Sequence, residues 1–388
     1  MRVLQVIPHY IPAYRFGGPQ RVAHSLGKAL ARSGHQVVVC TTNLADETSD
    51  LEVPLDKPVN RDGVTIYYEP SAISRYWGFS FKLFQRISRE MAHTDVALVH
   101  AHYQFANWAG AWLARRYRKP YVIFAHGSLH RQGISHKRSV VKRLYLRLLE
   151  RSNFAGALFI AFNAPEEQRF SLFNERGRII PSGIDPSEFA QMPPPGCFRQ
   201  RFSIPRDRIC FLFLGRLDIQ HKGLDLLIPA FGRLARQNPM VHLVLAGPDE
   251  DGGADEIYRL AKQHDVAGAI TLTGLISGQE KLAALQDADA FVLPSRFEGL
   301  SIALLEALYV GLPVLVTDQV GLSIEIDRIG AGKVVTANSE AIRAALEKLT
   351  DPVERAVMRD KGRDLILRKY TWDAISVGLI DEIQRAIS

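Results

Sequence analysis

Two acidic residues, Glu298 and Glu306, stand in the run EGLSIALLE, which follows an apolar segment and opens a predicted helix. The spacing places Glu298 on the loop before the helix and Glu306 inside it, so both carboxylates can face a ligand at the amino end of the helix. There the N–H groups of Gly299, Leu300 and Ser301 and the helix dipole suit a diphosphate, and the carboxylates suit sugar hydroxyls. The alternative is that both acids are ordinary exposed side chains.

Two basic residues follow another apolar segment, ICFLFL. Arg216 stands directly after Gly215, and Lys222 lies in the run HKG, so both belong to the loop before the next predicted helix. A fixed guanidinium and a mobile ammonium at the end of a strand could neutralise a diphosphate as its bond to a sugar breaks. Each of them alone is also compatible with an ordinary surface base.

Other candidate residues offer backbone groups rather than charge. Gly247 follows one predicted strand, and three residues follow the next and could contact a base or ribose: Gly274, Leu275 and Ile276. Gly17 and Gly18 end the long loop after the first strand, where their amides could meet a phosphate, although a plain turn fits equally well. No GxGxxG occurs at any of these places, which argues against a dinucleotide-dependent dehydrogenase.

His126 follows the apolar run YVIFA directly, which is where a ligand-facing residue belongs, although a core or surface histidine is the alternative. Three further histidines, His100, His102 and His130, stand nearby. No carboxylate or cysteine joins them at ligand-like spacing, so no metal site is predicted.

Strands must position these residues. Short apolar runs alternate with amphipathic helical patterns throughout the chain, which predicts parallel sheets covered by helices. The expected strands of the first half are 3–7, 37–41, 95–100, 121–124 and 158–161. The expected strands of the second half are 209–214, 241–246, 270–273, 290–293 and 314–317.

The run PSGIDPSEFAQMPPPG, residues 181–196, is rich in Pro, Gly and Ser and predicts a linker. It divides the chain into two domains, 1–180 and 181–370. The last helix, 371–388, is expected to pack back on the first domain. Because ligands of open parallel sheets bind beyond the carboxyl ends of the strands, two such domains predict a central cleft.

Charge is unevenly distributed along the 388 residues. Residues 1–180 hold 25 Lys and Arg against 13 Asp and Glu, whereas residues 181–388 hold 23 against 28. Much of the excess lies in Arg131–Arg151, a basic amphipathic stretch. An anionic membrane surface is one possible partner; a surface helix packed on its own sheet is the alternative, and no motif supports nucleic acid.

The remaining composition describes an ordinary globular chain with 47% hydrophobic residues. Three widely spaced cysteines argue against a disulfide framework and for a reducing, cytoplasmic compartment. No apolar stretch approaches the ~20 residues of a membrane-spanning helix, and the first apolar run is too short for a signal peptide.

Together these motifs resemble the retaining, nucleotide-sugar-dependent glycosyltransferases of the GT-B fold, specifically the large fourth family, or group 1, with its bacterial glucosyl- and mannosyltransferases. The resemblance covers nearly the whole chain. It is carried by Gly17–Gly18, His126–Gly127, IPSGID at 180–185, Gly215–Arg216, His221–Gly223 and Glu298–Glu306.

The resemblance implies two Rossmann-like domains that face a cleft, of which 1–180 would bind the acceptor and 181–370 the nucleotide-sugar donor. Arg216 and Lys222 would hold the diphosphate, Glu298 the transferred sugar and Glu306 the ribose, while His126 would support the developing oxocarbenium charge. It implies a metal-independent reaction with no cofactor, in which the nucleotide sugar is a substrate. One departure stands out: GLSIA follows Glu298 where the family often has GFGLP, and loss of the second glycine could alter sugar selectivity or activity.

The expected function is hexose transfer from a nucleotide sugar to a saccharide or lipid-linked saccharide in polysaccharide biosynthesis. UDP-glucose is favoured as donor, with GDP-mannose next. Two alternatives stay open at this point: a nucleotide-sugar epimerase of the same fold and a non-catalytic nucleotide-sugar-binding module. The basic stretch favours transfer, because an epimerase has little use for an anionic acceptor surface. A location at the inner face of the cytoplasmic membrane would suit such an acceptor.

Overall fold

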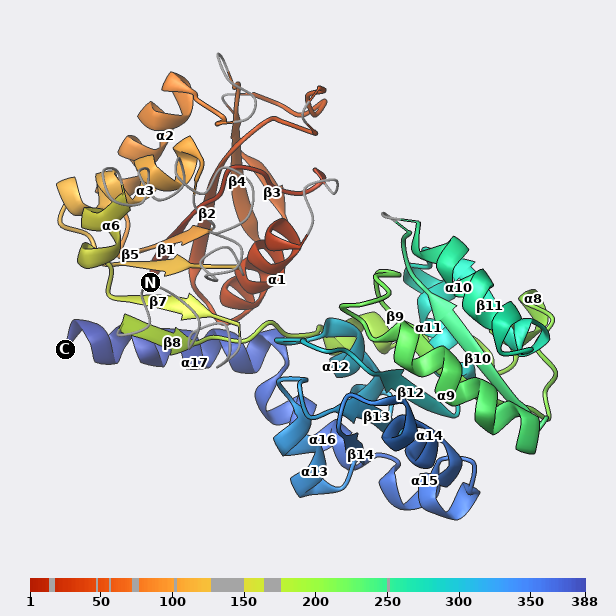
Figure 1. Ribbon diagram of the computed structural model, residues 1–388. Coiled ribbons are helices and arrows are strands. Elements are labelled where there is room, and N and C mark those ends of the chain that lie inside the picture. Colours follow the sequence, from red (N-terminus) through yellow and green to blue (C-terminus); the bar gives the residue numbers. More distant parts are fainter. Residues whose placement is uncertain are drawn as a thin grey trace. The chain divides into compact units, whose positions relative to one another are not determined.

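The computed structural model describes residues 1–13, 18–46, 48–55, 57–71, 77–100, 103–126, 150–163, 176–249 and 252–388. The chain divides into two compact units (Figure 1). Unit 1 contains Met1–Gly183 and Trp372–Ser388, and unit 2 contains Ile184–Thr371. The division lies close to the boundary expected after residue 180.

In the part of unit 1 that the structure describes, eight strands form one sheet in the order β3-β4-β2-β1-β5-β6-β7-β8. All neighbours pair in parallel except β3 and β4. The strands are β1 (Arg2–Val6), β2 (Gln36–Thr42), β3 (Val59–Arg61), β4 (Val64–Glu69), β5 (Val96–His100), β6 (Tyr121–Phe124), β7 (Phe159–Phe162) and β8 (Gly177–Ile179).

Helices cover both faces of this sheet, because side chains alternate along each strand. In β1, Val3 belongs to one buried cluster and Leu4 to the cluster on the other face. Among the described residues of unit 1, the helices are α1 (Pro19–Arg32), α2 (Phe81–Ala92), α3 (Phe105–Arg116), α6 (Arg151–Gly156) and α17 (Trp372–Ile387).

The chain returns to unit 1 through its last helix. Helix α17 packs beside α1, with Leu379 and Ile383 fully buried and Arg32 paired with Asp373 at 2.8 Å. Figure 1 shows α17 beside β8, far from β8 in sequence. The last helix therefore contributes to the core of the domain that contains the amino terminus.

Unit 2 has a six-stranded, wholly parallel sheet in the order β11-β10-β9-β12-β13-β14. Its strands are β9 (Ile209–Leu214), β10 (Val241–Ala246), β11 (Ile270–Gly274), β12 (Ala290–Leu293), β13 (Val314–Thr317) and β14 (Gly332–Val335). Its α-helices are α8 (Cys197–Arg201), α9 (Leu224–Gln237), α10 (Gly253–Gln263), α11 (Gly278–Asp287), α12 (Ile302–Tyr309), α13 (Ser323–Ile329), α14 (Ser339–Lys348), α15 (Pro352–Met358) and α16 (Lys361–Lys369). Two short 3₁₀ helices span Pro186–Phe189 and Ala267–Ala269.

The strand order of unit 2 reverses its direction between β9 and β12, which creates a topological switch point. From β9 the chain moves outward through β10 and β11, and it then returns to the other side of β9 with β12. The loops after β9 and β12 therefore leave neighbouring strand ends in opposite directions. In open α/β sheets this divergence opens the crevice in which ligands bind.

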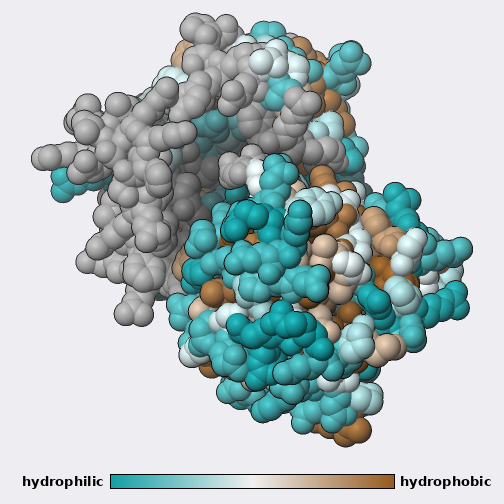
Figure 2. All heavy atoms as spheres, turned by 45° about the vertical axis from the view of Figure 1, so that its right-hand side comes forward, coloured by the Kyte–Doolittle hydropathy of each residue, from teal (hydrophilic) through white to brown (hydrophobic). Residues whose placement is uncertain are grey.

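Within the part of the chain that the structure describes, no helix is both long and apolar enough to cross a bilayer. Figure 2 shows a face on which hydrophilic side chains predominate and apolar ones occur in small groups. Most of the basic stretch Arg131–Arg151 lies outside the described residues, and so do Gly17, His102 and His130.

Candidate active site

The loop between β9 and α9 carries the two predicted cations of unit 2. Gly223 must be glycine, because its φ is 67° and a Cβ there would lie 2.1 Å from the carbonyl oxygen of Pro294. This close approach brings the β9 loop against the segment that follows β12. The N–H of Arg296 in that segment donates to the carbonyl of His221 at 2.9 Å. Lys222 is thereby fixed beside the second loop.

The loop after β12 carries Glu298 and leads into α12. Its backbone is held by the segment after β13: the N–H of Glu298 donates to Gln319 at 3.2 Å, and its carbonyl accepts from Gly321 at 2.8 Å. Helix α12 begins after Ser301, whose hydroxyl accepts from the N–H of Leu304 at 3.3 Å. The expected helix start is therefore close to the observed one, with Gly299 and Leu300 immediately before it.

An ion pair joins the two loops. The Nζ of Lys222 donates to Oε2 of Glu298, and their side chains are only 12% and 15% exposed. Sequence reasoning selected both residues, and the structure brings them together. In such a partly enclosed position the charges attract each other more strongly than a pair in open water would. The ammonium group of Lys222 and the carboxylate of Glu298 thus meet between the loop after β9 and the loop after β12.

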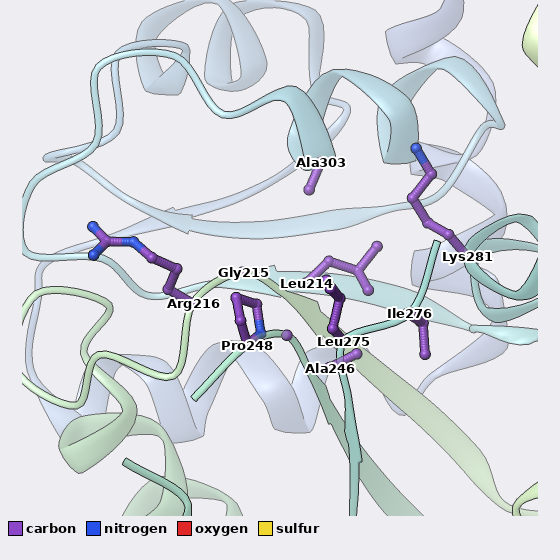
Figure 3. A pocket seen from close by; sticks show the side chains of 10 residues that line it. Leu214, Gly215, Arg216, Ala246, Pro248, Leu275, Ile276, Lys281 and Ala303 are labelled. Atoms are coloured by element: carbon purple, nitrogen blue, oxygen red, sulfur yellow. The ribbon is translucent and has the colours of Figure 1, made fainter. Parts of the chain in front are cut away.

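A pocket of about 170 Å³ in unit 2 is lined by Leu214, Gly215, Arg216, Ala246, Gly247, Pro248, Leu275, Ile276, Lys281 and Ala303. It is far larger than the ~15 Å³ that one water molecule needs, so it can admit part of an organic ligand. Figure 3 shows Arg216 on one side and Lys281 on the other, with apolar side chains between them. Four predicted residues line it: Arg216, Gly247, Leu275 and Ile276.

Two predicted glycines shape the floor of this region. Gly247 has a φ of 156°, and a Cβ there would lie 1.7 Å from the carbonyl oxygen of Gly215. Its N–H donates to the carbonyl of Gly274 at 2.9 Å. Gly274 itself has a φ of 71° and ends β11 without lining the pocket. The ends of β9, β10 and β11 therefore lie close together through glycine backbone.

Glu306, the second acid of the EGLSIALLE run, is buried rather than exposed. It is 5% exposed within α12, and its Oε1 accepts from Nζ of Lys281 at 2.5 Å. Burial raises the pKa of Glu306, while Lys281 lowers it and Glu188 raises it further. Sequence reasoning missed Lys281, because a lysine within an amphipathic helix carries no motif.

The predicted residues of unit 1 lie on different elements. His126 follows β6 with a φ of 46°. Its Nε2 lies 3.1 Å from Nδ1 of His100, and the two rings stack at 5.3 Å. His100 is fully buried, and this burial lowers its pKa well below the ordinary value. Gly18 caps the amino end of α1.

The arrangement in unit 2 suits a phosphorylated ligand with several hydroxyl groups. Arg216 and Lys222 supply donors and positive charge, and Glu298 and Glu306 supply acceptors. The residues that the structure describes contain no group of three or more His, Cys, Asp or Glu that could hold a metal ion.

Two family matches divide the chain almost as the structure does. Residues 16–188 match the family described as "Glycosyltransferase Family 4", and residues 198–365 match "Glycosyl transferases group 1". Between them these matches include every predicted site residue.

Among curated proteins, the chain is 26% identical over 403 residues to a D-inositol 3-phosphate glycosyltransferase of Stackebrandtia nassauensis, covering 95% of this chain and 88% of that one. It is 24% identical over 384 residues to a phosphatidyl-myo-inositol mannosyltransferase of Mycolicibacterium smegmatis, covering 98% of this chain and 92% of that one.

Among solved structures, Anabaena HepE in complex with UDP has a TM-score of 0.73 and 16% identity, and the alignment covers 99% of this chain and 100% of that one. HepE has also been solved with UDP-glucose, with a TM-score of 0.71. This likeness shows the fold, which is the two-domain GT-B arrangement of α/β units.

These matches favour a transferase over an epimerase of the same fold and over a binding module without turnover. The resemblance drawn from the motifs agrees with the two units, whose sheets are mainly and wholly parallel, with the switch point that carries paired charges and with both family matches. The chain belongs to the group 1 glycosyltransferases.

Proposed function

We propose that this glycosyltransferase moves a hexose from a nucleotide sugar to a saccharide or lipid-linked saccharide, with retention at the anomeric carbon. The observation that carries the proposal is the Lys222–Glu298 ion pair, with Arg216 on the same loop as Lys222. Breaking a bond between a sugar and a diphosphate leaves negative charge on the phosphate and positive charge on the sugar. Cations and a carboxylate held side by side can stabilise these two charges.

Each residue has a role in this proposal. Arg216 and Lys222 hold the diphosphate, with the amides at the start of α12, and Glu298 accepts hydroxyls of the transferred sugar. Glu306 accepts ribose hydroxyls, and the backbone at Gly247 and at 274–276 contacts the base.

His126, from unit 1, supports the oxocarbenium charge. Retention follows when the acceptor hydroxyl attacks from the face on which the phosphate leaves, without a covalent nucleophile. The reaction needs no metal, because the cationic side chains supply the positive charge.

The proposed donor is a UDP-hexose such as UDP-glucose, with GDP-mannose next. HepE, which shares the fold, has been solved with UDP-glucose, whereas the M. smegmatis relative is a mannosyltransferase. A thermal-shift panel of UDP, GDP and ADP sugars tests the choice. A ligand present at 100 times its Kd stabilises the folded state by about 2.7 kcal/mol, so the true donor should raise the melting temperature most. A larger rise with GDP-mannose would contradict the proposed donor.

Hexose transfer itself is tested by nucleotide release. The preferred donor is incubated with and without a crude fraction of lipid-linked saccharides, and free nucleoside diphosphate is measured. We expect release to increase severalfold with acceptor. Equal release with and without acceptor, with no labelled hexose in the lipid fraction, would contradict the proposed acceptor class.

We also propose that the protein works in the cytoplasm at an anionic membrane surface and contributes to polysaccharide biosynthesis. The support comes from the sequence, since residues 1–180 carry a large excess of basic side chains and Arg131–Arg151 contains many of them. Lys and Arg near an anionic surface contribute about 1 kcal/mol each to binding.

A further inference from the structure

Lys281 stands at a place where two features of unit 2 meet. Its Nζ is paired with the buried carboxylate of Glu306, and its side chain also lines the pocket that contains Arg216. The Lys281 side chain is 25% exposed and that of Glu306 is 6% exposed. Lys281 is therefore the member of the pair that lines the pocket, whereas the carboxylate of Glu306 is nearly enclosed.

The charges around Glu306 determine whether its carboxyl group is ionised. The ionisable groups that act on it are Lys281, from α11, and Glu188, from the 3₁₀ helix Pro186–Phe189. Burial and the negative charge of Glu188 both favour the protonated carboxyl group, and only Lys281 opposes them. A protonated carboxyl group becomes partly a donor, whereas the carboxylate offers acceptor positions on both oxygens.

Few side chains of the pocket can bind a polar group of a ligand. Of the lining residues that the structure describes, only Arg216 and Lys281 have charged side chains, and Figure 3 shows them on opposite sides of the pocket. The other lining side chains are apolar or absent. Recognition of hydroxyl groups at the Lys281 side therefore depends on the Lys281–Glu306 pair.

We propose that Lys281 is a positioning residue that supplies the counter-charge with which Glu306 accepts hydrogen bonds from the vicinal hydroxyls of the donor's ribose. The inference rests on the proposed function, which assigns the ribose to Glu306. It goes further by making a lysine on a different helix responsible for the preference of the site for ribonucleotides over deoxyribonucleotides. Lys281 itself need not touch the reacting atoms.

A purely structural role would predict something different. If the pair only tied α11 to α12, loss of Lys281 would lower stability and weaken all nucleotides alike. The proposed role predicts that the ratio of affinities changes, because a 2′-deoxynucleotide has already lost one of the hydroxyls in question. The ratio separates the two interpretations even when the variant is less stable.

The experiment measures the Kd of UDP and of 2′-deoxy-UDP by calorimetry at pH 7.5, for the wild type, Lys281→Met, Lys281→Arg and Lys333→Met. Lys333 is the matched control: it pairs with Glu354 at 2.6 Å, is 26% exposed and lies in the same unit outside the pocket. We expect the wild type, Lys281→Arg and Lys333→Met to prefer UDP by about tenfold, the equivalent of 1.4 kcal/mol. Lys281→Met should bind both ligands within about twofold of each other.

A pH series on Lys281→Met gives a second, independent readout. Without the lysine, the pKa of Glu306 is held above the ordinary value by burial and by Glu188, so the carboxyl group ionises only as the pH rises. The preference for UDP should therefore return at higher pH in this variant and stay nearly constant in the wild type. If Lys281→Met does not fold, the same measurements on Lys281→Gln replace it.

The outcomes are distinguishable. A wild type that prefers UDP and a Lys281→Met variant that keeps the same preference would overturn the role of Lys281 and leave the proposed function intact. A wild type that binds neither UDP nor 2′-deoxy-UDP, or that binds the two equally, would overturn the ribose assignment and the role of Lys281 together.

Discussion

At the residue scale, the two acids of the EGLSIALLE run are held in the same way. Each carboxylate is paired with a lysine from another element, Glu298 with Lys222 and Glu306 with Lys281. Such pairs keep charges in partly enclosed positions, where a lone charge would be costly. A ligand that brings its own phosphates and hydroxyls can exchange contacts with both members of a pair.

The first prediction concerns Lys222 and Glu298. Replacing either by alanine should lower kcat/KM for hexose transfer about 100-fold or more, because each stabilises charge that develops as the glycosyl bond breaks. Each single change also leaves the other charge without this partner, so the double variant should regain some stability without regaining activity. Activity assays and urea unfolding check the two effects, with Lys333→Ala as the control outside the site. Near-normal turnover in both folded single variants would refute the assignment.

The second prediction follows from the positive charge of Arg216 and Lys222. If these side chains neutralise the leaving diphosphate, transfer should persist in excess EDTA. Arg216→Ala should lose about 100-fold in activity, and added Mg²⁺ should not restore it. Initial rates with EDTA, and with Mg²⁺ added back, provide the measurement. Loss of wild-type activity in EDTA and its recovery with a divalent ion would contradict the metal-independent reaction.

Sequence reasoning found the charged residues at strand ends but not their partners. Lys222 and Glu298 follow apolar runs that predict strands, so the place of each was predictable. Their contact was not, because it depends on β9 and β12 being neighbours in the sheet. His100 was considered as a metal ligand and rejected, and its burial against His126 was not predicted.

At the scale of elements, Asp287 shows how short elements are fixed. It ends α11, and its carboxylate accepts from the backbone N–H groups of Gly196, Phe198 and Arg199 at 2.6, 2.9 and 3.1 Å. These are N–H groups at the amino end of α8, which lack partners within the helix. One buried side chain thus ties the segment after the linker to the core of unit 2.

The third prediction is that Asp287→Ala lowers the free energy of unfolding of unit 2 by about 2 kcal/mol, because several buried N–H groups lose their acceptor. Asp287→Asn keeps one acceptor oxygen and should cost less. Urea unfolding followed by circular dichroism measures both. Asp207→Ala, an exposed acid in the same unit, serves as the control. Equal stability of Asp287→Ala and Asp207→Ala would show that the cap contributes little.

The fourth prediction concerns the basic stretch Arg131–Arg151. If it binds an anionic membrane, the protein should sediment with vesicles that contain acidic lipid and should be released by salt. Changing Lys137, Arg138, Lys142 and Arg143 to glutamate should abolish sedimentation without affecting donor binding.

The matched control for the vesicle experiment reverses four exposed basic residues of unit 2: Lys262, Lys348, Arg359 and Lys369. It changes the net charge equally. If both quadruple variants lose binding to the same extent, overall charge and not this stretch is responsible. If the wild type ignores acidic vesicles at low salt, the membrane proposal fails.

The elements themselves were predictable to different degrees. Strands with apolar or nearly apolar runs, such as β9, β10 and β12, occur where expected, because both faces of a central parallel strand are buried. The sequence analysis did not identify β3, β4 or β14. β4 is an interior strand of six residues, so its absence from the expected strands is a miss that a weak edge pattern does not explain. β3 has three residues and β14 is only half buried, so neither has a strong apolar pattern. Edge strands carry weak signals for this reason.

At the scale of the whole molecule, the division into two units was predictable from the Pro- and Gly-rich segment and from the repeated alternation of strands and helices. The order of the strands was not, because apolar runs predict that a strand is buried without saying which neighbours it has. The packing of α17 on α1 agrees with the expectation that the last helix returns to the first domain.

The two units also differ in a way that unfolding can detect. All four tryptophans, Trp77, Trp108, Trp112 and Trp372, belong to unit 1. Tryptophan fluorescence therefore follows unit 1, whereas far-ultraviolet circular dichroism follows both units. This difference allows each unit to be observed in the intact chain.

The fifth prediction uses this difference to separate the acid sensitivity of the units. Burial lowers the pKa of His9 and of His242 to about 4 and that of His100 well below its ordinary value. His9 and His100 belong to unit 1 and His242 to unit 2. Below about pH 6.5 the unfolded chain binds protons at these histidines and the folded chain does not, so stability falls as the pH falls toward 4.

Between pH 7.5 and 5.5, His9 and His242 should each cost about 1 kcal/mol. Unit 1 should lose more stability than unit 2, because the pKa values of His24, His35 and His100 are lowered there as well. Lowering the pH to 5.5 should lower the urea midpoint of the fluorescence transition, which reports unit 1. The part of the dichroism change that fluorescence does not follow reports unit 2, and its urea midpoint should fall by less. His9→Gln should reduce the shift seen by fluorescence, while His242→Gln should leave it unchanged. A fluorescence midpoint that does not move between the two pH values would show that the buried histidines of unit 1 accept protons without unfolding.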